Sequence, residues 1–158
     1  NDGSFLALKS DGTVWGWGSN QFGCLGLGNA VQRNSPVQVQ INGATGGPIT
    51  GVSWLYGACG GHFHRFFFGK TDGSTWACGV NNYGTLGIGH DNDVSIFTQV
   101  LLPEAISQMS SAWLDTRRDT HYWLGLSGTV YAAGFGNNGQ LGDGGTLWSS
   151  SPSKVIVV

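Results

Sequence analysis

The chain has 158 residues, of which 40% are hydrophobic, so it has the length and the apolar content of one folded domain. Only 10% are charged and the formal net charge is -2, which excludes the basic stripe expected of a nucleic-acid binder. No apolar run reaches the ~18 residues of a membrane span. The 28 glycines, interleaved with Trp, Phe, Leu and Val, favour many short strands joined by tight turns.

The first predicted hairpin joins strands at 5–9 and 13–17 through the pair Asp11-Gly12. Asp-Gly is typical of a two-residue hairpin turn in which both central positions have positive φ. A glycine-rich loop follows, and then an outer strand is predicted at 36–41. Its first residue is Pro36, where proline removes no ladder hydrogen bond.

The second and third repeat units follow the same order, with further strands in front of the hairpin. The second has predicted strands at 52–59, 62–69 and 96–102 around a turn at 71–74. The third has predicted strands at 106–114, 121–126, 129–133 and 154–158 around a Ser127-Gly128 turn. The first unit lacks the two strands that precede the hairpin in the others, so we expect the chain to begin and end inside such units.

These units are built on a stretch that occurs three times, at 11–28, 72–89 and 127–144. Written without gaps, the copies share five glycine positions, one leucine and one aromatic position. We assign a structural role to these residues: Gly12, Trp15, Gly18, Gly23, Leu25, Gly26, Gly28, Gly73, Trp76, Gly79, Gly84, Leu86, Gly87, Gly89, Gly128, Tyr131, Gly134, Gly139, Leu141, Gly142 and Gly144.

Tandem four-stranded antiparallel units with glycine and aromatic signatures predict an all-β fold, a β-propeller. We expect one propeller segment, 1–158, of about three blades, with repeat units at approximately 1–48, 49–105 and 106–158. Because propellers usually close with about 4 to 8 blades, we expect further chain or other copies to complete the ring. The chain begins without Met, which suggests processing or a longer parent protein.

The pattern of Asp-Gly, an aromatic residue, Gly and Asn-x-x-Gly-x-Leu-Gly-x-Gly resembles the repeat of the regulator of chromosome condensation family. The matching segments are 17–28, 78–89 and 133–144, and Cys59-Gly60-Gly61-His62 resembles the stretch before the family's hairpin. The resemblance implies a propeller of typically seven blades. Its namesake members exchange guanine nucleotide on a small nuclear GTPase and dock on nucleosomes, and many other members only bind. No stretch here matches the exchange surface.

Two groups of potential metal ligands have a structural interpretation instead. Cys59, His62 and His64 are suitable zinc ligands at short spacing, but no fourth ligand is evident nearby. Asp91 and Asp93 offer carboxylates to calcium, but the EF-hand pattern does not continue beyond them. We interpret the first group as packed strand residues and the second as a solvated loop, and we predict no metal site.

No catalytic or cofactor motif is present. The glycine-rich segments recur three times without a following helix, which favours structural turns over phosphate binding. Glu104 is the only Glu, and no nucleophile has a recognisable context. The three cysteines, Cys24, Cys59 and Cys78, cannot all pair within the chain. The sequence therefore predicts a protein that is not an enzyme and has no cofactor.

Contacts with a partner are expected at the segments that differ between the repeats, because loops on a rigid scaffold carry function. These segments are Asn29–Ser35, Asn42–Gly51, His90–Ser95 and Asp115–Thr120. Tryptophan is enriched at binding surfaces, but core packing is the better interpretation for each of Trp15, Trp17, Trp54, Trp76, Trp113, Trp123 and Trp148.

The sequence thus favours a non-catalytic β-propeller scaffold that binds a protein partner or further propeller blades, with no nucleic-acid or membrane partner. A guanine-nucleotide exchange factor and a glycan-binding propeller are the alternatives. Sparse charge and the abundance of Gly, Ser, Thr and Asn favour an extracellular or virion surface.

Overall fold

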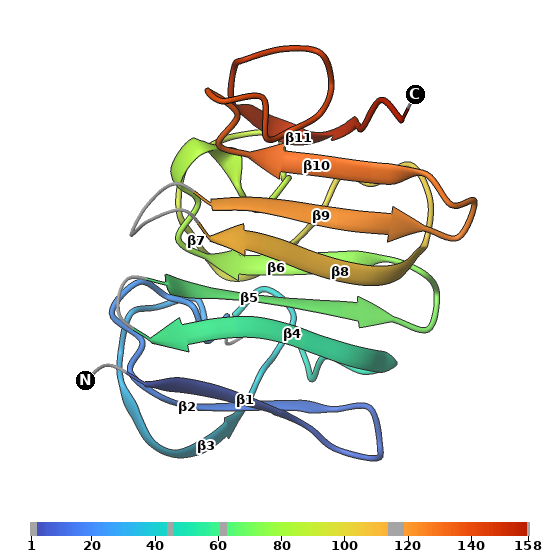
Figure 1. Cartoon of the computed structure of the whole chain (residues 1–158). Helices are drawn as coiled ribbons and strands as arrows, with labels where there is room; N and C mark the ends of the chain where they lie inside the picture. Colours follow the sequence, from blue (N-terminus) through green and yellow to red (C-terminus); the bar gives the residue numbers. More distant parts are fainter. Residues whose placement is uncertain (1–2, 44–45, 61–62, 114–118, 158) are drawn as a thin grey trace. The chain divides into compact units, whose positions relative to one another are not determined.

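The computed structural model describes residues 3–43, 46–60, 63–113 and 119–157 of the chain. These residues form eleven β-strands in three antiparallel sheets and one short 3-10 turn, so the predicted all-β fold class is confirmed (Figure 1). The chain divides into two compact units, one of Asn1–Val80 with Asp93–Gln99 and one of Asn81–Asn92 with Val100–Val158.

The first compact unit contains two sheets, in which each strand pairs with the strand that follows it in the chain. The first sheet has the order β1-β2-β3 and the second has the order β4-β5-β6-β7. The strands are β1 Ser4–Leu8, β2 Val14–Gly18, β3 Arg33–Gln38, β4 Val52–Gly60, β5 Phe63–Lys70, β6 Thr75–Gly79 and β7 Val94–Gln99.

The second compact unit contains the third sheet, of order β11-β10-β9-β8, and the 3-10 turn η1, Asn82–Gly84. Its strands are β8 Ile106–Trp113, β9 Asp119–Gly125, β10 Val130–Gly134 and β11 Ser149–Lys154. No helix among the described residues is long and apolar enough to cross a membrane.

The hairpin between β1 and β2 turns through three residues, so the expected two-residue turn is wrong. The Lys9 N–H donates to the Thr13 carbonyl at 2.9 Å, and the Gly12 N–H donates to the Lys9 carbonyl at 2.9 Å. Within the turn only Gly12 has a positive φ, 78°. This is a type I turn followed by a left-handed glycine. Both central residues of a type I turn have negative φ, so Asp11 needs no positive φ. Its carboxylate also bonds within the turn, accepting from the Thr13 N–H at 3.0 Å and the Thr13 hydroxyl at 2.6 Å.

The outer strands β3, β7 and β11 begin two to five residues before the predicted starts at 36, 96 and 154. Pro36 is therefore the fourth residue of β3. The prediction followed the apolar alternation after Pro36, but an outer strand pairs on one side only, so polar residues and proline are tolerated there. Val39 has already left the strand, although its N–H still donates to the Val14 carbonyl at 2.9 Å. Val158, the predicted end of the last strand, lies outside the described residues.

The first sheet also differs from the prediction at its inner edge. β1, β5 and β9 correspond, because each precedes a repeat hairpin. In front of β5 and β9 the other two sheets each add a single strand, β4 or β8. Within the described residues the first sheet therefore lacks one strand, and the expected difference of two was wrong.

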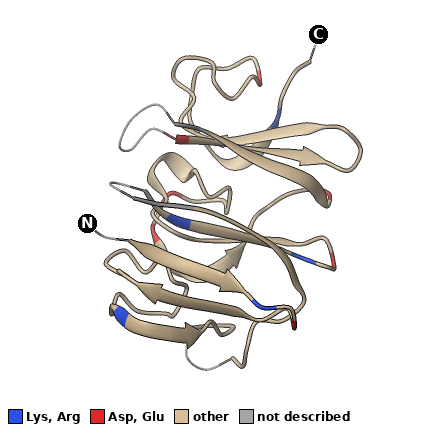
Figure 2. Cartoon of the chain, turned by 60° about the horizontal axis from the view of Figure 1, so that its bottom comes forward, with Lys and Arg blue, Asp and Glu red and all other residues tan. Residues whose placement is uncertain are grey.

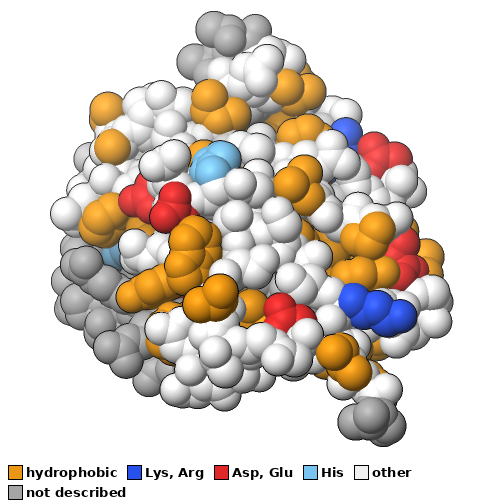
Figure 3. All heavy atoms as spheres, turned by 90° about the horizontal axis from the view of Figure 1, so that it is seen from above, with side chains coloured by type: hydrophobic (Ala, Val, Ile, Leu, Met, Phe, Trp, Pro, Cys, Tyr) orange, Lys and Arg blue, Asp and Glu red, His pale blue; other side chains and the backbone are white. Residues whose placement is uncertain are grey.

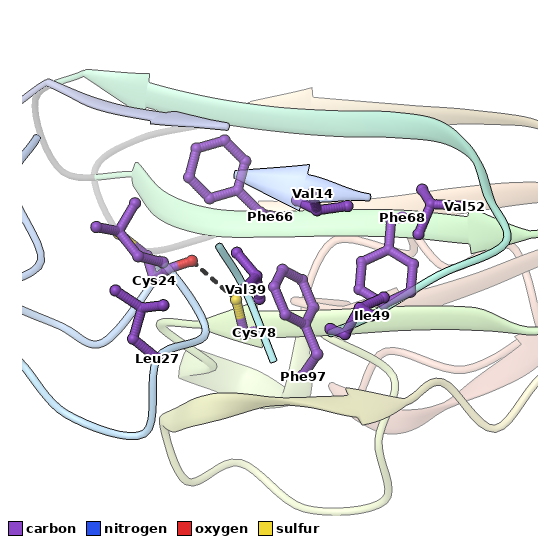
Figure 4. Packing of buried hydrophobic residues seen from close by; sticks show 11 residues of the cluster. Val14, Cys24, Leu27, Val39, Ile49, Val52, Phe66, Phe68, Cys78 and Phe97 are labelled. Carbon is purple, nitrogen blue, oxygen red and sulfur yellow. Dashed lines mark hydrogen bonds between the residues drawn. The ribbon is translucent and has the colours of Figure 1, made fainter. Parts of the chain in front are cut away.

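The core of the first compact unit lies between its two sheets and the loops that connect their strands (Figure 4). Val14, Leu25 and Val39 are fully buried, and Phe68 packs on Phe97 with 4.6 Å between ring centroids. Burial of each large apolar side chain contributes about 1.5 to 3 kcal/mol. The Cys78 thiol also lies inside, where it donates to the Cys24 carbonyl at 2.8 Å. Burial raises the pKa of Cys78 well above its ordinary value.

Candidate interaction surface

Every repeat glycine named above has a positive φ, and the three repeat leucines, Leu25, Leu86 and Leu141, are buried. The requirement for glycine is strictest at Gly18, Gly79 and Gly134, which end β2, β6 and β10. There φ is 95°, 107° and 113°. A Cβ would clash with the carbonyl oxygen of Gly3 just before β1, of His64 in β5 and of Asp119 in β9, respectively. These glycines allow the chain to leave the sheet and enter a glycine corner.

We call residues 20–28, 81–89 and 136–144 corners one, two and three. The first two are held by a buried asparagine, the first residue of the Asn-x-x-Gly pattern, to which the sequence analysis assigned no structural role. The Asn81 side chain accepts from the Leu86 N–H at 2.8 Å and donates to the carbonyls of His90 and Asn92 at 2.7 and 3.1 Å. Asn20 makes the same three bonds in corner one. Asn20 and Asn81 share one position between two repeat glycines, and this recurrence is the sequence signal that could have revealed their role.

Corner three replaces this asparagine with Gly136 and folds by another route. A Cβ at Gly136 would clash with the Leu147 carbonyl, so the returning chain occupies the place of the asparagine side chain. The large apolar side chains of Leu147 and Trp148 remain 76% and 44% exposed. Trp148 is therefore a surface residue, and the interpretation that it packs in the core was wrong.

Corresponding residues after each corner form what we call the variable loops: 30–32, 91–93 and 146–148. All of their residues are exposed, whereas most of corners one and two is buried. Their chemistry differs, with Ala-Val-Gln in the first, Asp-Asn-Asp in the second and Thr-Leu-Trp in the third. Exposed tryptophan and leucine on a braced loop are suited to contact with another protein.

The other predicted contact segments are only partly loops. Ser35 belongs to β3 and Ser95 to β7, while Asp119 and Thr120 are buried in β9. Residues 44–45 and 114–118 lie outside the described residues. The side chain of Trp113 is likewise not described, Trp123 is fully buried, and Trp15, Trp17, Trp54 and Trp76 are half-buried.

The potential metal ligands do not assemble into a described site. His64 is buried and packs on Phe22, with 4.8 Å between ring centroids. His62 and the side chain of Cys59 lie outside the described residues, while Asp91 and Asp93 are exposed in the second variable loop. The described residues contain no group of three or more His, Cys, Asp or Glu placed to hold a metal ion.

Glu104 has a structural role that the sequence did not reveal. Repeat three has Ser127 in place of the turn aspartates Asp11 and Asp72. Glu104 supplies the missing carboxylate, accepting from the Ser127 N–H at 2.8 Å, the Ser127 hydroxyl at 2.6 Å and the Tyr131 hydroxyl at 2.9 Å. The bonds from Ser127 hold the pKa of Glu104 below its ordinary value.

Charged side chains add little to the surface. Charged side chains are few and scattered over the described residues (Figure 2). On the face shown in Figure 3, hydrophobic side chains are interspersed with uncharged polar side chains and backbone. A hollow of about 110 Å³ in the first compact unit is lined by residues that include Ile41, Phe68, Trp76 and Phe97. Small-molecule sites usually have about 300 to 1,000 Å³, so this one admits only a small ligand.

Consecutive antiparallel sheets of three or four strands with glycine corners define a segment of a β-propeller. A model described as "Regulator of chromosome condensation (RCC1) repeat" matches residues 11–64 and 127–157, which is more than half of the chain. The chain belongs to this RCC1 repeat family, as the sequence resemblance predicted.

Solved structures support the propeller fold. Prp20p from Saccharomyces cerevisiae superposes with a TM-score of 0.72 at 19% identity, over 98% of this chain and 36% of that chain. Human WBSCR16 superposes with a TM-score of 0.71 at 21% identity, over 99% of this chain and 36% of that chain. The predicted β-propeller architecture is therefore confirmed.

The curated relatives are longer proteins. The ultraviolet-B receptor UVR8 of Arabidopsis thaliana is 30% identical over 94% of this chain and 31% of its own length. A probable human E3 ubiquitin-protein ligase, HERC3, is 32% identical over 95% of this chain and 13% of its own length. The secretion-regulating guanine nucleotide exchange factor of Bos taurus is 32% identical over 86% of this chain and 27% of its own length. The chain thus spans less than a third of each.

Proposed function

We propose that the chain is a non-catalytic β-propeller module that binds a protein partner through its variable loops. The observation that carries the proposal is the third variable loop, where Leu147 and Trp148 are exposed on a backbone held in place at Gly136. Tryptophan is enriched among the residues that dominate protein interfaces. Burying this pair against a partner would remove apolar surface from water without requiring the loop to reorganise.

The relatives support a binding role more than a catalytic one. The solved structure of Prp20p is described together with its binding properties to Gsp1p and histones, and another is described as Kap60 bound to yeast RCC1. HERC3 is named as a probable ligase, but the match covers 13% of its length. We assign no ligase chemistry to this segment. The relatives give no support to the extracellular or virion setting that composition suggested.

The test is binding of the immobilised chain to yeast Gsp1p, to histones and to Kap60, measured by biolayer interferometry. We expect binding to at least one of them, weakened at least tenfold by the double variant Leu147→Ser/Trp148→Ser. The control is Leu126→Ser, which removes an equally exposed leucine from the β9-β10 turn. No binding by the folded chain, or equal weakening by the control, would contradict the proposal.

A guanine-nucleotide exchange factor is the second candidate, and the relationship to the bovine exchange factor favours it. Release of a fluorescent GDP from Gsp1p separates the two functions. A binding module leaves the release rate unchanged, whereas an exchange factor accelerates it. The glycan-binding alternative stays a prediction, for which a glycan array is the direct test.

A further inference from the structure

The hollow of about 110 Å³ in the first compact unit lies apart from the variable loops and shares no residue with them. We call it the linker hollow, because one side is formed by Ile41 and Ile49 of the chain between β3 and β4. The other side is formed by Phe68 of β5, Trp76 of β6 and Phe97 of β7. All of these residues belong to the first compact unit.

The walls of the linker hollow are apolar and are fixed by their own packing. Ile49, Phe68 and Phe97 are buried, and Figure 4 shows them side by side. Phe68 stacks on Trp76, with 6.3 Å between ring centroids and 14° between ring planes. The Trp76 indole is held in turn, because its Nε1 donates to the Ser74 hydroxyl at 2.9 Å. The hollow is therefore preformed, and an apolar ligand need not reorganise it.

The volume of the linker hollow limits what it can hold. An enclosed apolar cavity of about 150 Å³ holds one molecule of benzene. With about 110 Å³, the linker hollow accepts one ring or one branched chain whose polar end reaches solvent. Ile41 is exposed, so the hollow is open beside this residue.

Lys70 gives the linker hollow a positive charge. Within the described part of the chain it is the one charged residue that lines the hollow. Its ammonium lies 3.8 Å from the Asp72 carboxylate, which makes an ion pair too long for a hydrogen bond. A lysine ammonium has three donors, so Lys70 can donate to a second carboxylate at the mouth of the hollow.

The corresponding lysine of the first repeat is arranged differently. Lys9 donates to the Asp11 carboxylate at 2.9 Å, and its ammonium lies 5.8 Å from the centroid of the Trp15 ring. The side chain of Lys9 is 55% exposed, whereas that of Lys70 is 26% exposed. Of the two lysines, Lys70 is thus the one that lies partly buried beside apolar walls.

The third repeat shows that a carboxylate fits at this place in a sheet. Glu104, from the chain that leads into β8, accepts from the hydroxyl of Tyr131, which is the counterpart of Trp76. Gly125 is the counterpart of Lys70, and a Cβ there would clash with the Glu104 carboxylate. The third repeat therefore fills this position with its own carboxylate, whereas the second repeat has a hollow with a cation beside it.

We propose that the linker hollow binds a small carboxylic acid whose apolar part is a single ring or a branched chain. The apolar part lies against Phe68 and Phe97, and the carboxylate accepts a hydrogen bond from Lys70. Both parts of the ligand are needed, because a partly exposed ion pair contributes little by itself. This site goes beyond the proposed function, since it does not depend on the variable loops.

The test is titration of the ¹⁵N-labelled chain with benzoate, followed by NMR. The indole N–H signal of Trp76, assigned with the variant Trp76→Phe, is expected to shift, whereas that of Trp15 is not. Benzamide has the same ring without the charge and should bind at least fivefold more weakly. Acetate has the charge without the ring and should leave the Trp76 signal in place.

Lys70→Gln should reduce the affinity for benzoate to that for benzamide. The matched control is Lys9→Gln, which removes the corresponding lysine of the first repeat, a residue that does not line the hollow. It should keep the affinity of the unmodified chain and its preference for benzoate.

Equal binding of benzoate and benzamide overturns the proposal, as does the absence of a shift at Trp76 or an equal loss in Lys9→Gln. Tighter binding of acetyl-Gly-Phe, a dipeptide with a free carboxylate, would make the C-terminus of a peptide the ligand and overturn the assignment to a free acid. None of these measurements involves Leu147 or Trp148, so their failure would leave the proposed function intact.

Discussion

Asn81 shows how much of a corner depends on one side chain. It is fully buried and its amide satisfies one N–H and two carbonyls of the surrounding loop. Backbone groups that leave a sheet need new hydrogen-bond partners. A hydrophobic side chain has no donor or acceptor, so it could not take the place of Asn81. Asn20 repeats the arrangement, so the asparagine is a recurring part of the repeat.

Replacing Asn81 with Ala is expected to destabilise the protein by about 2 to 4 kcal/mol, because buried backbone groups lose their partners. Asn92→Ala is the control, since its side chain is exposed, and it should change stability by less than about 0.5 kcal/mol. Urea unfolding followed by tryptophan fluorescence measures both. Equal effects would show that the three bonds of Asn81 are not what holds corner two.

The turn carboxylates give the fold a dependence on acid. Hydrogen bonds from Thr13 and Ser74 lower the pKa of Asp11 and Asp72, and bonds from Ser127 lower that of Glu104. A lower pKa in the folded state means that the unfolded state binds more protons in acid. The stabilisation is therefore present above the unfolded pKa of about 4, and it is lost as pH falls through the folded values.

Glu104→Gln is expected to lower the melting temperature at pH 7 and to flatten its decline in acid. The double variant Glu104→Gln/Ser127→Asp places the carboxylate in the turn itself, as in the first two repeats, and should restore both properties. Thermal unfolding followed by circular dichroism between pH 2 and pH 7 measures them. A double variant no better than Glu104→Gln would contradict the assigned exchange of roles.

At the scale of elements, corners two and three allow a matched comparison. Gly84 and Gly139 have φ values of 68° and 74°, so alanine costs about 1 to 2 kcal/mol of backbone strain at either position. At Gly84 the new Cβ would also clash with the backbone of Ser150, whereas at Gly139 it meets open space. The difference between the two variants therefore isolates the packing of a corner against β11.

Gly84→Ala is expected to be more destabilising than Gly139→Ala by about 1 to 3 kcal/mol, the usual range for overpacking. The measurement is urea unfolding of both variants at the same protein concentration. If the two alanine variants lose the same stability, β11 does not lie against corner two as described.

The parts of this fold that could be predicted are those fixed by neighbours in sequence. The hairpins were recognised from Asp-Gly pairs and the corners from glycine spacing, because turn geometry is decided within a few residues. β11 was misplaced, since an edge strand of sequence SSSPSK carries no apolar alternation. Glu104 and Ser127 are 23 positions apart, and nothing local to either residue indicates that they meet.

The candidate surface was predictable only as a set of segments. The loops that differ between repeats were recognised, but the roles of individual residues depend on the third dimension. Trp148 was expected in the core and is exposed, while Trp123 of the same repeat is fully buried. Both are preceded by apolar or aromatic residues in the sequence, so composition alone does not separate them.

At the scale of the whole molecule, the proposed binding of a protein partner has a thermodynamic consequence. A partner that binds only the folded chain stabilises it by mass action, so the melting temperature depends on the concentration of that partner. We expect the melting temperature of the unmodified chain to rise with the concentration of whichever of Gsp1p, histones and Kap60 it binds.

The double variant Leu147→Ser/Trp148→Ser should lose most of this rise, because the exposed apolar pair of the third variable loop no longer contributes to binding. Leu126→Ser should keep it, since that leucine is equally exposed but lies in the β9-β10 turn. Differential scanning fluorimetry over a concentration series of the partner measures all three chains. Parallel increases in every variant would place the contact on another face of the molecule.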